Sequence, residues 1–212
     1  MTFDALYSDR RGRFPATMTN DGQTIVLRVL GVAFSGHDFS DLMPDADAPS
    51  TSLDGFSLRE SRLRACDLSL TIPVPILDHG QDATGHLTVE VSLGNGTFYK
   101  ALKLTLVAGD VRVSCSGEGT EAYFEERLLD LGRQLPQGIS IKICFTCQYS
   151  DYSVYGSSPF GGMMCFRNQK EAYSRARTKH AFLELEDHGE RVQETWLCPE
   201  YTPRIAGTGY RG

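Results

Sequence analysis

Four of the six cysteines fall in the last third of the chain, with a spacing that is typical of a metal site. Two of them are separated by only two residues, and they follow an alternating apolar segment where a strand is expected to end. A close pair of thiolates can hold one metal ion from a tight turn, and four thiolates satisfy the tetrahedral preference of Zn²⁺ with no open position. We therefore predict a structural zinc site. Its ligands are Cys144, Cys147, Cys165 and Cys198.

Other chemistry remains open for these cysteines. They can be free thiols of the core, or the close pair can be a redox pair. Such pairs normally begin a helix in a thioredoxin-like βαβ unit, and no such pattern precedes Cys144. One thiol can instead be a catalytic nucleophile that works with His180 or His188. Either histidine is also the natural substitute if one cysteine is not a ligand, and iron is the other metal that four thiolates accept.

The residues before the cysteine pair predict strands and tight turns. Asn20-Asp21-Gly22 is a hairpin signal ahead of an apolar segment at 24–30. Pro73 and Pro75 place their segment at a sheet edge or outside the sheet, because proline cannot donate a ladder hydrogen bond. Three further segments alternate apolar and polar residues, and they are 87–93, 102–106 and 111–115. Strands at this spacing with one polar face predict an antiparallel sheet or sandwich.

The period of the apolar residues changes near residue 120. Four apolar residues recur every three or four positions, as on one face of a helix, and they are Phe124, Leu128, Leu131 and Leu135. Thr120 is the expected N-cap of this helix, and Pro136 ends it. A buried strand at 139–143 then leads into the cysteine pair. Two short helices are expected further on, at 168–176 and after a capping Thr178.

These elements predict one α+β domain of 212 residues. Its fold class is an antiparallel, β-rich, sandwich-like body with a few short helices and a C-terminal four-cysteine metal-binding subdomain. Residues 1–118 form the β-rich part, 119–143 a helix plus a strand, and 144–212 the cysteine-cluster subdomain. Cys66 and Cys115 lie in or beside alternating strands, so we expect them to be small buried hydrophobes.

The segment between Cys147 and Cys165 is rich in tyrosine, serine and glycine. This composition is typical of an adaptable recognition surface, and we predict that its side chains bind a partner. The residues concerned are Tyr149, Asp151, Tyr152, Tyr155 and Phe160. The alternative is that the aromatic residues pack back over the metal and the sheet, since a loop of this length needs apolar anchors. The acidic segment 38–47 is a second expected contact surface.

The formal net charge of −6 argues against a general nucleic-acid coat protein and permits a basic protein partner. Locally, a nucleic-acid-binding face is conceivable on a basic run near the tyrosines, although such a run is also typical of a solvated helix face. The run contains Arg167, Lys170, Arg175, Arg177 and Lys179, and the first four are the expected contacts to nucleic acid. The first residues lack the features of a signal peptide, and no apolar stretch is long enough to cross a bilayer. We therefore expect a cytoplasmic protein with no membrane contact.

Several motifs of the C-terminal third carry a family resemblance. They are Cys144-x-x-Cys147-x-Tyr-Ser-Asp-Tyr-Ser, Met164-Cys165-Phe166-Arg167-Asn168, Gln193-Glu194-Thr195-Trp196-Leu197-Cys198-Pro199-Glu200 and Gly207-Thr208-Gly209-Tyr210-Arg211-Gly212. In these motifs the chain resembles a family of uncharacterised bacterial proteins, known as a domain of unknown function. The resemblance extends more loosely to segments 31–36 and 73–75. It implies a free-standing bacterial protein whose four late cysteines belong to a shared motif, and it implies no activity, substrate or partner.

The sequence contains no recognisable catalytic set. A Gly-x-Ser-x-Gly elbow does not occur, and Gly161-Gly162 is too short for a phosphate loop. We therefore predict a non-enzymatic bacterial protein that zinc stabilises and that binds another protein, as an immunity protein, an inhibitor or an accessory subunit. Two alternatives stay open. They are a cysteine-dependent enzyme or thiol redox protein, and a nucleic-acid-binding module. The sequence leaves the oligomeric state undetermined.

Overall fold

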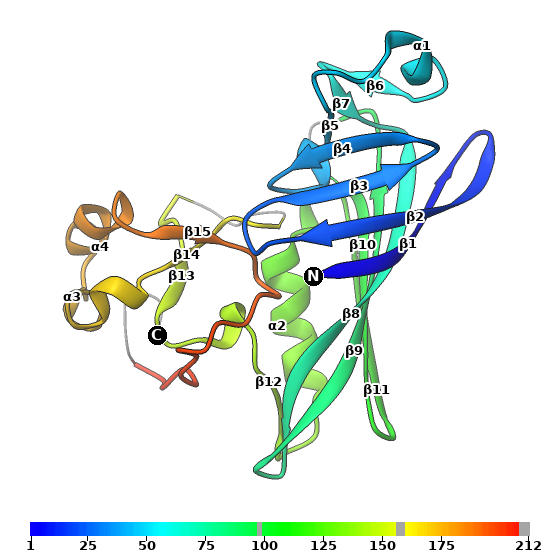
Figure 1. The fold of residues 1–212 in the computed structure, drawn as a ribbon. Coiled ribbons are helices and arrows are strands. Elements are labelled where there is room, and N and C mark those ends of the chain that lie inside the picture. Colours follow the sequence, from blue (N-terminus) through cyan, green and yellow to red (C-terminus); the bar gives the residue numbers. More distant parts are fainter. Residues whose placement is uncertain (97–98, 156–159, 208–212) are drawn as a thin grey trace.

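A ten-stranded antiparallel sheet forms the body of the protein (Figure 1). The computed structural model describes residues 1–96, 99–155 and 160–207. The strand order is β11-β10-β9-β8-β1-β2-β3-β4-β5, and β12 also pairs with β8. These strands are β1 Thr2–Asp9, β2 Gly12–Asn20, β3 Ile25–Val29, β4 Val32–Gly36, β5 Met43–Pro44, β8 Cys66–Asp78, β9 Gln81–Leu93, β10 Tyr99–Ala108, β11 Val111–Glu118 and β12 Ile139–Ile141.

The β-rich, antiparallel character that the sequence predicts is confirmed, together with the scarcity of helices. The body is one continuous sheet rather than two stacked sheets, and it bends so that β3 and β4 cross the direction of β8 and β9 (Figure 1). Smaller elements decorate one end of it. They are η1 Phe39–Asp41, α1 Ser50–Leu53 and the two-stranded sheet of β6 Leu58–Arg59 and β7 Arg62–Leu63.

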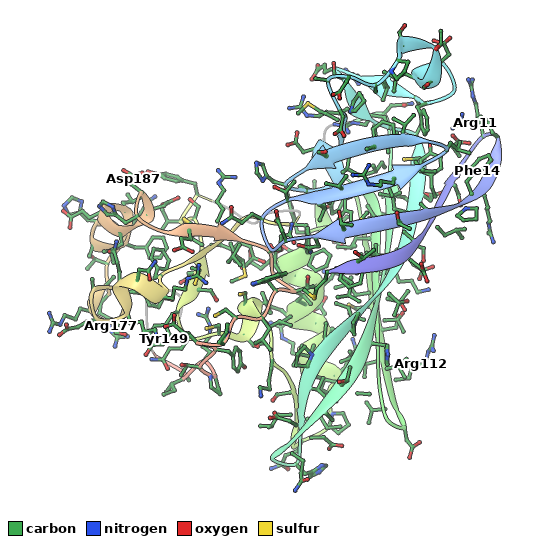
Figure 2. All side chains as sticks on the ribbon, viewed as in Figure 1. Arg11, Phe14, Arg112, Tyr149, Arg177 and Asp187 are labelled. Atoms are coloured by element: carbon green, nitrogen blue, oxygen red, sulfur yellow. The ribbon has the colours of Figure 1, made fainter. Side chains whose placement is uncertain are left out.

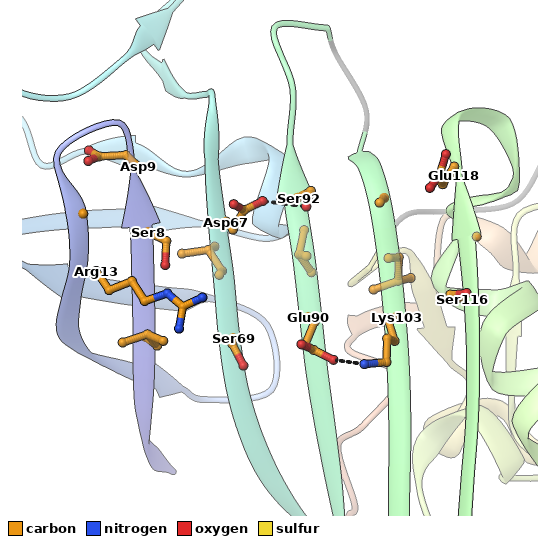
Figure 3. Close-up of a pocket in the computed structure, with 17 residues that line it drawn as sticks. Ser8, Asp9, Arg13, Asp67, Ser69, Glu90, Ser92, Lys103, Ser116 and Glu118 are labelled. Carbon is orange, nitrogen blue, oxygen red and sulfur yellow. Dashed lines mark hydrogen bonds and ion pairs between the residues drawn. The ribbon is translucent and has the colours of Figure 1, made fainter.

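Each long strand buries one face, as the alternation of its residues predicts. The buried side chains of β8 are Cys66, Leu68, Leu70, Ile72, Val74 and Ile76. The opposite face is polar and open (Figure 3). There the Ser92 hydroxyl donates to Asp67 at 2.5 Å, and the Lys103 ammonium lies 2.7 Å from the Glu90 carboxylate. The core therefore lies on one side of the sheet only.

Strand β8 continues through Pro73 and Pro75 instead of leaving the sheet. Its partner β9 pairs with it along its whole length, whereas on the other side β1 pairs with 67–70 and β12 with 76–78. The carbonyl of Pro75 accepts a hydrogen bond from the Lys142 amide at 2.8 Å, so the backbone of this proline faces the interrupted side. The prolines thus sit at a local edge, where a missing N–H group removes no hydrogen bond of the β8–β9 ladder.

Helix α2 (Phe124–Gln134) covers β10 and β11 on the buried side of the sheet. Its fully buried apolar side chains, Phe124, Leu128 and Leu131, are three of the four that the spacing predicts. The fourth, Leu135, lies just beyond the helix and is only partly buried. The expected N-cap is wrong, because the helix begins after Tyr123 and not after Thr120. The chain first makes the 3-10 turn η2 (Gly119–Glu121), which the Ala122 amide closes by donating to the Gly119 carbonyl at 3.2 Å.

We call residues 144–155 and 160–207 the cysteine subdomain, and they lie beside α2 on the side away from β11 (Figure 1). Figure 2 shows Tyr149 and Arg177 on this subdomain and Arg112 on the opposite flank. The Thr178 hydroxyl accepts from the Ala181 amide at 3.2 Å, which confirms the predicted N-cap. Its elements are η3 Cys144–Thr146, β13 Ser150–Tyr152, β14 Met163–Cys165, η4 Arg167–Gln169, α3 Lys170–Arg175, α4 Lys179–Glu186 and β15 Glu190–Val192. Within the described ranges, every helix is too short or too polar to cross a membrane.

The C-terminal segment is anchored on the hairpin turn between β2 and β3. The Asn20 side chain accepts from the Gly22 amide at 2.6 Å, and the Gly22 carbonyl accepts from the Gln193 amide at 3.0 Å. Gly22 has a φ of +98°, and a Cβ added there would lie 2.7 Å from ring atom Cδ2 of Trp196. The turn therefore requires glycine both for its backbone conformation and for the contact with the tryptophan ring.

Replacing Gly22 with alanine should lower the free energy of unfolding by about 2 kcal/mol, because strain at positive φ adds to the clash with Trp196. Gly31→Ala is the matched control, since Gly31 has a φ of +79° but no atom within 4 Å of an added Cβ. The control should lose only about 1 kcal/mol. Urea denaturation followed by fluorescence measures both, and the chain has a single tryptophan as reporter. Equal losses with unchanged native emission would show that Trp196 does not rest on this turn.

Candidate functional site

The four predicted zinc ligands come from segments that meet beside the sheet. Cys144 begins η3, and the Cys147 amide donates to the Cys144 carbonyl at 3.0 Å, which closes the turn between them. Cys165 ends β14 and is paired in register with Ser150 of β13. The Cys144 amide donates to the Trp196 carbonyl at 2.6 Å, so the segment that carries Cys198 returns to the same turn.

A cavity of about 210 Å³ lies at this meeting point. Its lining includes Cys144, Cys165, Cys198, Trp196 and Arg167. Burial raises the pKa of the Cys144 thiol, and the neighbouring Cys165, Cys147 and Cys198 raise it further. Burial also raises the pKa of Cys165, although Arg167 opposes that shift. Without a metal, Cys144 and Cys165 are therefore neutral thiols near pH 7, which makes them poor nucleophiles.

Hydrogen bonds fix the backbone of the turn that carries the cysteine pair. The Thr146 hydroxyl donates to the Ile141 carbonyl at 2.6 Å and accepts from the Ile143 amide at 3.2 Å. The buried Ser150 hydroxyl donates to the Cys144 carbonyl. Side-chain groups thus satisfy the polar backbone of an irregular segment, which holds the two cysteines in place relative to β12 and β13.

The metal-binding subdomain that the sequence predicts is not shown by the structure. In the part of the chain that the structure describes, no group of three or more histidine, cysteine, aspartate or glutamate side chains is arranged so that it could hold a metal ion. The two substitute histidines do not line the cysteine cavity. His180 is largely exposed and its imidazole lies 3.3 Å from Glu184, and His188 is exposed as well.

Two carboxyl groups with raised pKa values lie where the cysteine subdomain meets the sheet, and they are the buried Glu194 and the half-buried Asp38. Glu194 is fully buried and accepts from the Gly161 amide at 2.7 Å and from the Tyr152 hydroxyl at 3.1 Å. Burial raises its pKa to about 7. Asp38 accepts from the Tyr99 hydroxyl at 2.5 Å, and burial raises its pKa to about 6. Each carboxylate also raises the pKa of a neighbour, because like charges repel in a medium that screens them weakly.

Three of the five residues predicted to bind a partner are buried within the chain itself. Asp151, Tyr152 and Phe160 are only 2%, 3% and 2% exposed. The ring of Phe160 packs 4.9 Å from that of Phe39 and 4.8 Å from that of Phe124, centroid to centroid. Phe160 therefore acts as an apolar anchor, as the alternative interpretation expects. Asp151 and Tyr152 belong to β13 rather than to a loop.

The other two predicted contact residues are accessible. Tyr155 is 74% exposed, with the Lys179 ammonium 4.5 Å from its ring centroid. Tyr149 is half-buried at the surface of the subdomain, and the Lys170 ammonium lies 5.2 Å from its ring centroid (Figure 2). Of the acidic segment 38–47, Asp38 is half-buried in the cluster described above, whereas Asp45 and Asp47 are exposed. Two of the five loop residues therefore remain accessible to a partner.

Most of the basic run is matched by acidic side chains. Arg167 pairs with Glu190, Arg175 pairs with Glu171, and the Lys170 ammonium lies 2.7 Å from Glu200. Arg177 donates to the carbonyl of Gly207. Each of these four basic side chains therefore has a partner within the chain itself.

A second hollow, of about 730 Å³, lies on the open polar face of the sheet (Figure 3). Its walls come from β1, β2, β8, β9, β10 and β11. Asp67 and Glu90 in its lining already have the partners Ser92 and Lys103. Pairs of this kind are common on the solvated face of a sheet. They do not indicate a particular ligand for the hollow.

Sequence reasoning missed these two acids and the role of Trp196. Glu194 lies in a short polar stretch of the C-terminal segment, where nothing in the neighbouring residues signals burial. Asp38 falls in a segment with four other charged or polar neighbours that favour exposure. The only available signal was the Asn20-Asp21-Gly22 turn, which predicts a hairpin but not the ring that rests on it.

Fold and site together define a β-rich protein in which a bent antiparallel sheet carries a C-terminal cysteine cluster. The chain belongs to the Family of unknown function (DUF6304), whose family model matches residues 1–150. The match spans the sheet, α2 and the first two clustered cysteines, and it confirms the resemblance to a family of unknown function. No curated protein and no solved structure matches the chain.

The raised pKa of Glu194 predicts a stability that depends on pH. Its pKa is about 7 in the folded chain against 4.5 ordinarily, so the folded state keeps a proton that the unfolded state has lost between these values. Stability from this group therefore falls as the pH rises through this window, and the loss is complete above about pH 7. Glu194→Gln cannot ionise, and it should gain on the order of 2 kcal/mol relative to the wild type between about pH 5 and pH 8.

Urea denaturation of the wild type and of Glu194→Gln at the two pH values measures this difference. A contribution of bound metal that is the same in both proteins cancels in the comparison. Glu184→Gln is the control, because the Glu184 side chain is 67% exposed. The control should track the wild type at both pH values. A Glu194→Gln variant that also tracks the wild type would contradict the raised pKa of Glu194.

Proposed function

We propose that Cys144, Cys147, Cys165 and Cys198 bind one structural Zn²⁺ ion, and that the protein is a non-enzymatic, cytoplasmic bacterial protein that binds another protein. In that role it is an immunity protein, an inhibitor or an accessory subunit. The observation that carries the zinc proposal is the common cavity of Cys144, Cys165 and Cys198, which are far apart in the sequence. Metal binding would then draw the thiols together from their present positions into a tetrahedral set.

The chemistry of the donor set favours a metal over a reactive thiol. Four sulfur atoms in a buried environment lose their protons readily only when a cation replaces them, and Zn²⁺ does so. The neutral Cys144 and Cys165 of the metal-free chain do not support a nucleophile or a redox pair. Zinc is proposed rather than iron because a closed four-thiolate site without an electron-transfer partner ordinarily holds zinc.

The binding role is supported by charge and by accessible aromatic side chains. The net charge of −6 favours a basic partner, and Tyr149 and Tyr155 remain accessible on the cysteine subdomain. The pairing of Arg167, Lys170 and Arg175 with carboxylates gives less support to a nucleic-acid partner. A structural metal in this place would fix the subdomain against the sheet and leave its outer surface for recognition.

Metal analysis of the untagged protein tests the zinc site, and we expect one zinc ion per chain. Four thiols should resist a thiol reagent until chelator and denaturant are added. Changing any one of the four cysteines to serine should release zinc and lower the melting temperature by roughly 10 °C or more. Cys115→Ser is the control and should keep its zinc, because Cys115 is a half-buried residue of β11. A metal-free protein with one or two fast native thiols would instead favour the cysteine enzyme.

Isothermal titration tests the binding role. Purified proteins encoded next to the gene for this chain are titrated into the zinc-loaded protein, and one of them should bind at micromolar concentration or tighter. Binding should weaken when a chelator removes the metal, because the subdomain surface loses its fixed shape. Absence of any binder among these neighbours would count against the proposed role while leaving the zinc result intact.

A further inference from the structure

Strand β11 forms one edge of the ten-stranded sheet, and within the described residues no strand pairs with its outer side. It is eight residues long and follows β10 through the two-residue turn Gly109-Asp110. An unpaired edge of this length leaves a row of backbone amide and carbonyl groups that another strand can bond. Such an edge either takes up a further strand or carries a feature that prevents it.

The geometry of the turn decides which backbone groups of β11 point outward. Gly109 has a φ of +57°, as the first central residue of a type II′ turn requires, and the flanking Ala108 and Val111 are partners in the register. In such a hairpin the flanking residues exchange both hydrogen bonds, and every second pair further along does the same. The even-numbered residues of β11 therefore turn their backbone groups to the free edge. These residues are Arg112, Ser114, Ser116 and Glu118.

One side chain of α2 already occupies this edge. The Nη1 group of Arg127 donates to the Ser116 carbonyl at 2.6 Å, which agrees with an outward direction of that carbonyl. The Nη2 group lies 3.1 Å from a carboxylate oxygen of Asp130 and 3.6 Å from one of Glu126. The Arg127 side chain is only 13% exposed. Two carboxylates thus hold the guanidinium where an incoming strand would have to place an amide.

The sequence of β11 is complementary to itself in an antiparallel pair. When Cys115 lies opposite the Cys115 of a second copy, the outward-facing residues of the two strands oppose each other, as an antiparallel ladder requires. Arg112 then lies opposite Glu118 of the second copy, and the two-fold symmetry repeats this pair of opposite charges. Both side chains are exposed, and neither makes an ion pair within the described residues. Figure 2 shows Arg112 on the outer flank, and Figure 3 shows Glu118 on the open face of β11.

We propose that Arg127 closes the edge of β11, and that withdrawal of its guanidinium lets β11 pair with the same strand of a second copy. The Nη1 group occupies a carbonyl that the second strand would need, and an incoming strand would remove the charged guanidinium further from water. Charged side chains protect sheet edges from association in this way. The inference concerns self-association and depends neither on the zinc site nor on the proposed protein partner.

Arg127→Met tests the inference, because methionine keeps an unbranched apolar stem and removes every N–H donor. The replacement also removes the Nε atom, which is buried and has no hydrogen-bond partner among the described residues, so we expect the fold to tolerate it. Sedimentation velocity of the full chain, supplied with zinc, measures the association. The dissociation constant of the dimer should be at least about tenfold lower for Arg127→Met than for the wild type. Arg127→Leu is a second variant with the same expectation.

Arg133→Met is the matched control on the same helix. The Arg133 side chain is 73% exposed, and its guanidinium also contacts Asp130, at 3.0 Å. This control loses the same charge and an ion pair with the same carboxylate, but it leaves the guanidinium of Arg127 on β11. Its association should equal that of the wild type.

Charge reversal locates the contact in the Arg127→Met background. Adding Glu118→Arg places like charges opposite each other and should return the protein to the monomer. Adding Arg112→Glu as well makes the opposing charges complementary again and should bring the dimer back. Glu184→Arg is the control for the change of charge, because the Glu184 side chain is 67% exposed on α4. It should leave the dimer intact.

An Arg127→Met protein that associates no more strongly than Arg133→Met would overturn the inference. A dimer that persists with Glu118→Arg would overturn it as well, because that dimer would use another surface. A wild type that already forms a dimer, and that Glu118→Arg converts to a monomer, would show that Arg127 does not close the edge. The metal analysis and the titrations with other proteins decide the zinc site and the binding role independently.

Discussion

Four backbone hydrogen bonds hold the C-terminal segment against the turn that carries the cysteine pair. They join the amides of Cys144, Phe145, Gln148 and Arg204 to the carbonyls of Trp196, Glu194, Thr202 and Thr146. The arrangement places Cys198 beside the cysteine cavity and buries the carboxylate of Glu194. The two segments that these hydrogen bonds join are irregular and far apart in sequence. Bringing them together costs chain entropy, and the few hydrogen bonds of the short strands offset only part of this cost.

The junction also carries an electrostatic cost. The carboxyl groups of Glu194, which is buried, and Asp38, which is half-buried, have raised pKa values. Near neutral pH, the ionised form of each therefore lowers the stability of the folded state. Hydrogen bonds from Tyr99, Tyr152 and Gly161 reduce this cost. A zinc ion bound by the four cysteines, as proposed, would offset this electrostatic cost, because its binding free energy adds to the stability of the fold at the same place. The metal would thus stabilise the junction between the C-terminal segment and the turn that carries the cysteine pair.

Local patterns identified much of the body correctly. The alternation of apolar residues predicted β9, β10 and β11, and the 3.6-residue period predicted the buried face of α2. Thr178 was a correct cap because its hydroxyl bonds within its own turn. Thr120 failed as a cap because a separate 3-10 turn precedes the helix. Pro73 and Pro75 predict a segment at a sheet edge or outside the sheet, whereas both lie in the central strand β8. The strand tolerates them because its other side is unpaired between the parts that β1 and β12 cover.

The sequence by itself determined the strand-forming segments, the helical face, the hairpin turn at Gly22 and the four cysteines that chemistry singles out. Each depends on neighbours within a few residues, where periodicity and backbone preference act directly. The tertiary structure decided which contacts these segments make. It buried Asp151, Tyr152 and Phe160, paired the basic run with acids and placed Arg127 of α2 at the edge of β11. Burial and the pairing of charges depend on contacts between distant segments, and local sequence patterns carry no signal for them.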